Sequence, residues 1–188
     1  MNFNMHGNLE GKHAFLSASK YHWTNYDDDK LISVYRNFMA TQRGTELHDF
    51  ARQCIRLRIR LPKTQSTLNC YVNDALGFRM TPEQPLYFSD NCFGTCDAIA
   101  FDERKKILRI HDLKTGDTPA NLQQLRIYAA LFCHEYKKNP KDITTILRIY
   151  QSNDILEEEA DPEEISRIMQ KIVKFDSLVE RMKTEESL

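Results

Sequence analysis

The sequence predicts a single α/β domain, with a mixed sheet of about four to five strands and helices packed on both faces. Its 188 residues suffice for one domain with a hydrophobic core. Apolar residues recur every three to four positions in much of the first 80 residues, which predicts a helical N-terminal third. From residue 86 onward, short β-branched and apolar segments alternate with longer helical patterns, which predicts a sheet covered by helices. We therefore expect one domain over 1–188, with a flexible start at 1–14, a helical part at 15–80 and an α/β core at 86–184.

The helical part is predicted from caps and apolar stripes. A first helix is expected to begin within 15–20, capped by Ser17 or Ser19. The three aspartates at 27–29 suit the positive end of a second helix, which Gly44 is expected to end. Thr45 would cap a third helix reaching residue 55, and a fourth is expected at 68–78. The aromatic residues at 21–26 either pack in a core or form a platform for an unpaired base.

Two strands joined by a charged turn at 102–105 form the centre of the chain. Side chains of a strand alternate between its faces, so Asp112 and Lys114 point to the same side. With Phe101 opposite Lys106, Asp97 would lie one step diagonal to Asp112. Two neighbouring carboxylates repel each other, and a divalent cation such as Mg²⁺ removes that cost. The alternative is an exposed hairpin whose Asp112 and Lys114 form a surface ion pair.

The chain after Lys114 is expected to form a helix, two strands and a last helix. Thr118 fits the N-cap and Pro119 the first position of a helix that runs to about residue 138. A buried strand at 143–150 and an acidic edge strand at 155–159 follow. A final amphipathic helix begins at 161–164, and its tail beyond Lys183 is expected to fray.

Four motifs occur in a fixed order along the chain: G-T-x-x-H at 44–48, Asp97, D-L-K at 112–114 and Q-x-x-x-Y at 124–128. This set resembles the PD-(D/E)xK nuclease superfamily, in particular the RecB-type branch with the lambda-type exonucleases and the CRISPR-adaptation nucleases. The similarity covers residues 15–150. It implies a restriction-endonuclease-like core and a metal-dependent DNA nuclease, as an exonuclease in recombination, repair or phage DNA processing.

The resemblance also implies roles for individual residues. Mg²⁺ or Mn²⁺ would be held by His48, Asp97, Asp112 and the backbone carbonyl of Leu113. Lys114 would position or deprotonate the attacking water, with Gln124 and Tyr128 steadying it and the strand end. The residues expected to contact DNA are Arg52, Arg56, Lys63 and Thr115. Taken without the resemblance, His48 is a half-buried packing residue, and the Gln124–Tyr128 pair is ordinary helix packing.

Two other functions are compatible with these residues: a structure-specific, resolvase-like endonuclease, and a non-catalytic DNA- or protein-binding module. The partner implied by the resemblance is DNA. The sequence contains no G-x-x-x-x-G-K-[ST] loop, so unwinding would need a helicase, and a single-strand annealing protein is a further candidate partner. A homo-oligomer is left open.

The charge and the cysteine content indicate which partners, cofactors and cellular compartment suit this chain. The net charge is −1, but residues 1–115 carry 16 basic against 13 acidic side chains, and residues 116–188 carry 10 against 14. The basic run from Arg52 to Lys63 either tracks phosphates or is a solvated helix face. Five irregularly spaced cysteines argue against a disulfide framework. Some CRISPR-adaptation relatives bind an iron–sulfur cluster through four cysteines, three of them near the C-terminus. Here no cysteine follows Cys133, so no cluster is expected. With no membrane-length apolar run either, we expect a cytoplasmic protein of a bacterium or a phage-infected host cell.

Overall fold

The structure is a computed structural model that describes residues 5, 7, 11, 14–116 and 118–186. The chain forms two compact units, residues 1–45 and residues 46–188. The expected flexible start at 1–14 falls for the most part outside the described residues. In the part of the chain that is described, no helix has both the length and the apolar character needed to cross a membrane.

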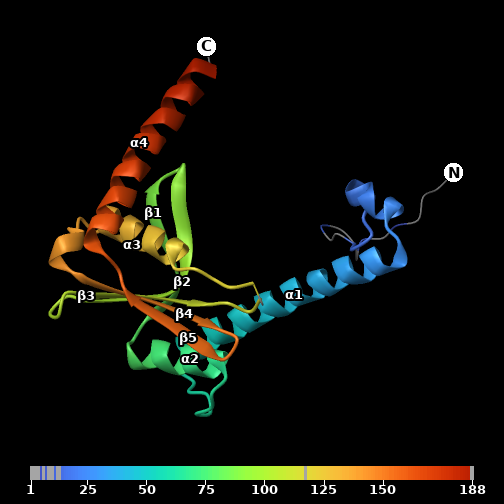
Figure 1. Ribbon diagram of the computed structural model, residues 1–188, viewed down its shortest axis with the longest axis horizontal. Coiled ribbons are helices and arrows are strands. Elements are labelled where there is room, and N and C mark those ends of the chain that lie inside the picture. Colours follow the sequence, from blue (N-terminus) through green and yellow to red (C-terminus); the bar gives the residue numbers. More distant parts are fainter. Residues whose placement is uncertain (1–4, 6, 8–10, 12–13, 117, 187–188) are drawn as a thin grey trace. The chain divides into compact units, whose positions relative to one another are not determined.

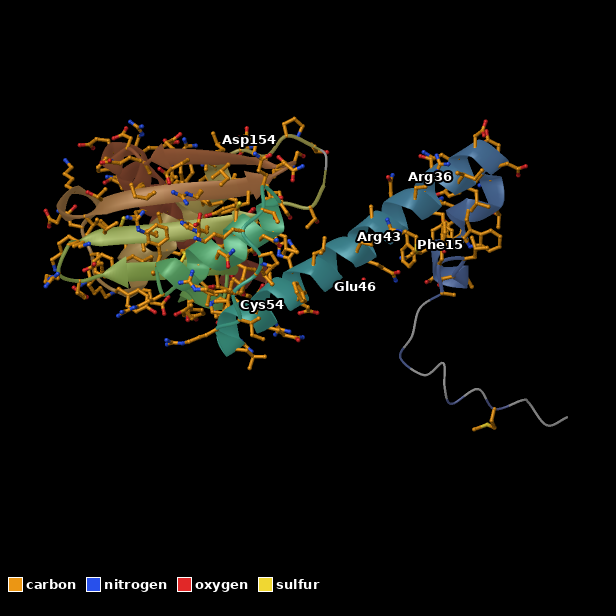
Figure 2. The ribbon with its side chains drawn as sticks, turned by 90° about the horizontal axis from the view of Figure 1, so that it is seen from below. Phe15, Arg36, Arg43, Glu46, Cys54 and Asp154 are labelled. Carbon is orange, nitrogen blue, oxygen red and sulfur yellow. The ribbon has the colours of Figure 1, made fainter. Side chains whose placement is uncertain are left out.

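The N-terminal unit contains the 3-10 helix η2 (Ala18–Asn25) and the beginning of α1 (Asp28–Leu57). The ring of Phe15, labelled in Figure 2, lies 5.1 Å from the ring of Tyr35 and 5.2 Å from that of Phe38. A helix begins within 15–20, as predicted, but it is a 3-10 helix, and Ser17 at its N-cap position makes no capping hydrogen bond with its side chain. The Ser17 hydroxyl bonds to the Ser19 hydroxyl instead of capping, and the backbone leaves helical geometry at Lys20.

Helix α1 begins where the aspartates predict it, because the Asp27 carboxylate accepts a hydrogen bond from the backbone N–H of Lys30 at 2.8 Å. It does not end at Gly44, as the sequence predicts, but continues to Leu57. Glycine costs a helix only about 1 kcal/mol relative to alanine, which does not outweigh the hydrogen bonds of an uninterrupted helix. Thr45 is accordingly no cap, and its hydroxyl donates to the carbonyl of Thr41 at 3.2 Å.

The second unit is built on a five-stranded sheet in the order β1-β2-β3-β4-β5. The strands are β1 (Thr81–Ser89), β2 (Cys92–Asp102), β3 (Ile107–Leu113), β4 (Thr144–Gln151) and β5 (Asp154–Glu159). Only β3 and β4 run parallel, and the other neighbours are antiparallel. The predicted mixed sheet is confirmed.

Helices cover both faces of this sheet (Figure 1). On one face lie α3 (Gln123–Glu135) and α4 (Pro162–Glu186), which bury a core that includes Leu108, Ile110, Leu125, Leu147 and Ile165. On the other face lie α2 (Thr67–Gly77) and the last turns of α1, including Cys54, which Figure 2 labels. Their core includes Val72, Ala75, Ala98, Leu113 and Tyr150. The last helix extends to Glu186, so the predicted fraying from Lys183 is not seen up to that residue.

The register of the central hairpin differs from the predicted one by two residues. Phe101 pairs with Leu108 and Ala98 pairs with His111, so the next pair along the ladder is Asp97 with Asp112. A two-residue shift keeps every side chain on its predicted face, since faces alternate with period two. Its effect is to bring Asp97 directly beside Asp112 instead of diagonal to it.

Helix α3 begins at Gln123, not at Thr118 and Pro119 as predicted. The side chain of Gln151 explains the difference. Its amide donates to the carbonyl oxygens of Gly116 and Thr118, and its oxygen accepts from the N–H of Ala120 at 3.0 Å. Backbone groups that a helix would use are thereby held in a loop.

We predict that Gln151→Glu lowers the free energy of unfolding by about 1–3 kcal/mol, because a carboxylate cannot donate to those two carbonyls. Urea unfolding measures the change. The matched control is Gln53→Glu at an exposed position of α1, which should change stability little. Equal stability of the two variants would show that Gln151 does not hold the loop.

His111 of β3 is buried on the face of the sheet that α2 covers. Its Nδ1 lies 3.2 Å from the Tyr150 hydroxyl. Burial, reinforced by the charges of Arg148 and Arg109, lowers the pKa of His111 to about 3. The unfolded chain binds a proton at this residue below pH 6.5, whereas the folded chain does not until about pH 3. Folding stability is therefore lost as the pH falls from 6.5 toward 3.

We predict that His111→Gln removes this loss, which amounts to about 3 kcal/mol by pH 4.5. Any packing cost of the substitution is the same at both pH values and cancels in the comparison of urea unfolding at pH 7.5 and 4.5. His22→Gln, at an exposed residue, is the control. A pH dependence that is the same in wild type and His111→Gln would contradict the assignment.

Candidate metal centre

Three carboxylates lie side by side on three neighbouring strands. Glu83 stands between two residues of β1 that pair with Ala98 and Cys96, which places it opposite Asp97 of β2. Asp97 in turn lies beside Asp112 of β3. Asp112 is buried, and Glu83 and Asp97 are half-buried. The row crosses the sheet near the C-terminal end of β3.

His48 approaches this row from α1. Its Nδ1 lies 3.3 Å from Oδ2 of Asp97. One donor atom each from His48, Glu83 and Asp97 lie within 4.8 Å of one another, a spacing at which three side chains can share one cation. The site thus has two oxygen donors and one nitrogen donor in one cluster, with Asp112 adjoining it.

A chain of polar contacts holds the other side of Asp112. Lys114 Nζ lies 3.0 Å from Oδ2 of Asp112 and donates to Oδ1 at 3.2 Å and to the side-chain oxygen of Gln124 at 2.9 Å. The Gln124 amide donates to the Tyr128 hydroxyl at 3.0 Å, and that hydroxyl donates to the carbonyl of Thr95 at 2.7 Å. The lysine is therefore tied through α3 back to β2.

Gly94 makes this chain of contacts sterically feasible. A Cβ atom at residue 94 would lie 3.0 Å from Cε1 of Tyr128, which is closer than side chains normally approach. Glycine lets the Tyr128 ring lie against β2, where its hydroxyl reaches Thr95.

The electrostatics of the site reflect crowding of negative charge. Burial, and then the charge of Asp97, raise the pKa of Asp112 above its usual value, with Lys114 opposing them. Burial and the charge of Asp97 likewise raise the pKa of Glu83. The hydrogen bond to Asp97 raises the pKa of His48. Each shift would be reversed by a positive charge placed among these carboxylates, because such a charge favours ionised acids and a neutral imidazole.

A divalent cation fits this donor set. Oδ2 of Asp112 is buried and accepts no hydrogen bond within the described part of the chain, although Lys114 is near it. A buried carboxylate oxygen without a hydrogen bond is costly, and a cation would satisfy it. Carboxylates suit Mg²⁺ and Mn²⁺, and an imidazole among them favours the softer Mn²⁺.

The other residues predicted for the site are placed as follows. The backbone N–H of Leu113 donates to Oδ2 of Asp97 at 2.9 Å, which fixes that carboxylate. Arg52 lies one turn after His48 on α1 but pairs with Asp49 at 2.7 Å. The remaining predicted DNA contacts are exposed and come from three separate segments: Arg56 at the end of α1, Lys63 in the loop after it, and Thr115 after β3.

Glu83 is the residue that sequence reasoning missed. The α/β core was expected to begin at residue 86, whereas β1 starts at Thr81. The hairpin closes with Ser89 opposite Cys92, but a bulge shifts the register by one residue before Tyr87 pairs with Phe93. Without the bulge, Glu83 would face Ala98 instead of Asp97. The available signal was an acid just before a strand that pairs with the Asp97 strand.

Comparisons with protein-family models, with curated proteins and with solved structures find no match to this chain.

We predict that the protein binds Mn²⁺ and that Glu83→Gln weakens this binding about tenfold or more, because one of the clustered oxygen donors loses its charge. Isothermal titration calorimetry measures the affinity. Glu159→Gln, at an exposed residue of β5, is the control and should bind Mn²⁺ as the wild type does. Unchanged binding by Glu83→Gln would remove Glu83 from the site.

Proposed function

We propose that this chain is a metal-dependent DNA nuclease that hydrolyses phosphodiester bonds as an exonuclease. The observation that carries the proposal is the row Glu83–Asp97–Asp112, with a histidine at one end and a lysine at the other. Adjacent carboxylates that are buried or half-buried destabilise a fold unless a positive charge lies among them. A catalytic metal ion would supply that charge. The four ordered motifs, which resemble those of RecB-type nucleases, support the same reaction.

The cation would be held by Asp97, Asp112, Glu83 and His48, which offer oxygen and nitrogen donors from four elements of the second unit. When bound, it would supply polarisation of a phosphoryl oxygen and a lower pKa for a neighbouring water. The carboxylates cannot attract a phosphodiester by themselves, since the carboxylates and the phosphodiester are all negatively charged. Binding of DNA at this place accordingly depends on the positive groups around the row.

Lys114 is the positive group best placed to act on the phosphate or on the water. Its Nζ is held by Asp112 on one side and by Gln124 on the other, so it does not sample many positions. A fixed ammonium offsets negative charge that develops on the phosphate, and costs no reorganisation at the moment of reaction. Gln124 and Tyr128 act as positioning residues, because they touch Lys114 and the backbone of β2.

We predict that Asp112→Asn lowers DNA cleavage more than about a thousandfold while the protein stays folded, since the amide fills the same space without the charge. The assay uses end-labelled linear DNA and covalently closed circles, single- and double-stranded, with Mg²⁺, Mn²⁺ or EDTA. Asp154→Asn, at an exposed position of β5, is the control and should cleave normally.

Degradation of linear DNA alone, lost with EDTA and with Asp112→Asn, is the expected result. Cutting of closed circles would contradict the exonuclease and favour a structure-specific endonuclease. DNA binding without cleavage under any metal would contradict catalysis and favour a binding module.

We further predict that Lys114→Met abolishes turnover but leaves Mn²⁺ affinity within a few-fold of the wild type, because the lysine acts on the phosphate or water and is not a ligand. Cleavage rates and calorimetric Mn²⁺ titrations separate the two effects. Lys174→Met, at an exposed residue of α4, is the matched control. Retained turnover would take Lys114 out of the mechanism.

A further inference from the structure

Two adjoining depressions lie on the face of the sheet that carries α2. The smaller, of about 280 Å³, is lined by the ends of α1 and α2 and by the start of β1. The larger, of about 720 Å³, is lined by the end of α2 and by the β2–β3 turn. Arg79 and Thr81 line both, so the two depressions lie next to each other, and together we call them the groove.

The groove is strongly basic. We call its six cationic residues the arginine groove: Arg56, Arg58, Arg79, Arg104, Lys105 and Arg109. None of the six makes an ion pair with another residue in the described ranges.

The two acids of the groove are occupied elsewhere. The Asp102 carboxylate accepts from the backbone N–H groups of Arg104 and Lys105 at 3.0 and 2.9 Å. Glu103 pairs with Lys106 and Lys138. The six cations outnumber these two acids, so the groove keeps an excess of positive charge for an external anion.

Two of the arginines lie at the ends of helices. Helices α1 and α2 end in the same way, with Arg58 and Arg79 just after the last turn at φ values of 56° and 55°. Glycine is the usual residue at this position, because a side chain there strains the backbone. Both helices instead place an arginine there, and both arginines line the groove. Lys137, which follows α3 and lies outside the groove, has the same conformation with a φ of 54°.

An aromatic ring accompanies the charges. The guanidinium of Arg109 lies 4.2 Å from the centre of the Phe78 ring, which fixes this arginine in the larger depression. Phe78 is 39% exposed. Cations beside an exposed aromatic side chain are typical of surfaces that bind single-stranded nucleic acid, where phosphates pair with the cations and bases contact the rings.

The groove also adjoins the metal centre. Pro82 lines its smaller depression and directly precedes Glu83. Its far end includes Ile107, five residues before Asp112 on β3, which corresponds to about 17 Å along the strand. Side chains of a strand alternate between its faces, so the groove and the carboxylate row share β1 and β3 but not one face of the sheet. A strand of nucleic acid that contacts both must pass over the edge of the sheet.

We propose that the arginine groove binds the sugar–phosphate backbone of one single nucleic-acid strand, on the part of that strand that extends beyond the metal centre. The proposal rests on the proposed nuclease function for the identity of the strand. The groove supplies affinity for long substrates, whereas the carboxylate row acts on the scissile bond alone.

The test is fluorescence anisotropy with labelled single-stranded DNA of about 4 and about 20 nucleotides, at several salt concentrations. All proteins carry Asp112→Asn, and the buffer contains EDTA, so that nothing is cleaved. The groove variant is Arg79→Gly with Arg109→Gln. The control is Arg181→Gln at an exposed residue of α4. Thermal unfolding checks the fold, and Arg79→Gly alone should keep or raise the melting temperature because it relieves the strained backbone.

The expected result is at least a tenfold loss of affinity for the long oligonucleotide and little change for the short one. The slope of log affinity against log salt should fall by about 1.4, since each phosphate contact to a single strand contributes about 0.7. Unchanged affinity and slope would overturn the proposal. A loss confined to duplex DNA, or to anionic lipid vesicles tested in parallel, would overturn the single-strand assignment.

The outcome is separable from that of the nuclease proposal. If the wild-type chain cleaves DNA but the groove variant binds normally, the groove fails and the nuclease stands. If the wild type cleaves nothing while the groove variant loses long-strand binding, the groove stands and the nuclease fails.

Discussion

The structure of the second unit depends on one electrostatic constraint: Asp112 is buried beside Asp97 at the end of the central hairpin. Like charges on neighbouring side chains favour protonation of one of the two carboxylates, and burial adds to that tendency. A lysine and a histidine lie beside the row. Lys114 lies against Asp112, and His48 lies against Asp97. Lys114 Nζ already lies 3.0 Å from the buried Oδ2 of Asp112, and a cation would neutralise the negative charge that the lysine and the histidine leave.

Much of the surrounding structure keeps these charges in place. Gln124 and Tyr128 connect Lys114 to the backbone of β2, which makes α3 a brace as well as a cover for the sheet. Gly94 admits the tyrosine ring, and Gln151 holds the loop that follows Lys114. Fixed charges act more strongly than mobile ones because they need no reorganisation when a substrate binds. The arginine groove, which begins one residue from Glu83, would extend this positive environment along a bound strand.

The alternation of strand side chains was enough to predict that Asp112 and Lys114 share a face, and helix periodicity was enough to pair Gln124 with Tyr128. The mixed sheet followed from the order of apolar segments. Features set by distant contacts were not predictable. Gln151 delays the start of α3 from about 30 residues away, and a bulge in β1 decides whether Glu83 faces Asp97. Gly44 looked like a helix end because glycine is unfavourable in helices, but one residue does not outweigh the hydrogen bonds on both sides.

The most direct test of the account is where a metal ion binds. Crystals soaked in Mn²⁺ and measured at the manganese absorption edge would give an anomalous peak at any Mn²⁺ site. The account predicts a peak among the carboxylates of Glu83, Asp97 and Asp112, and its loss in crystals of Asp112→Asn. A protein that cleaves DNA with Mn²⁺ but shows its peak elsewhere, or shows none at the row, would contradict the central claim.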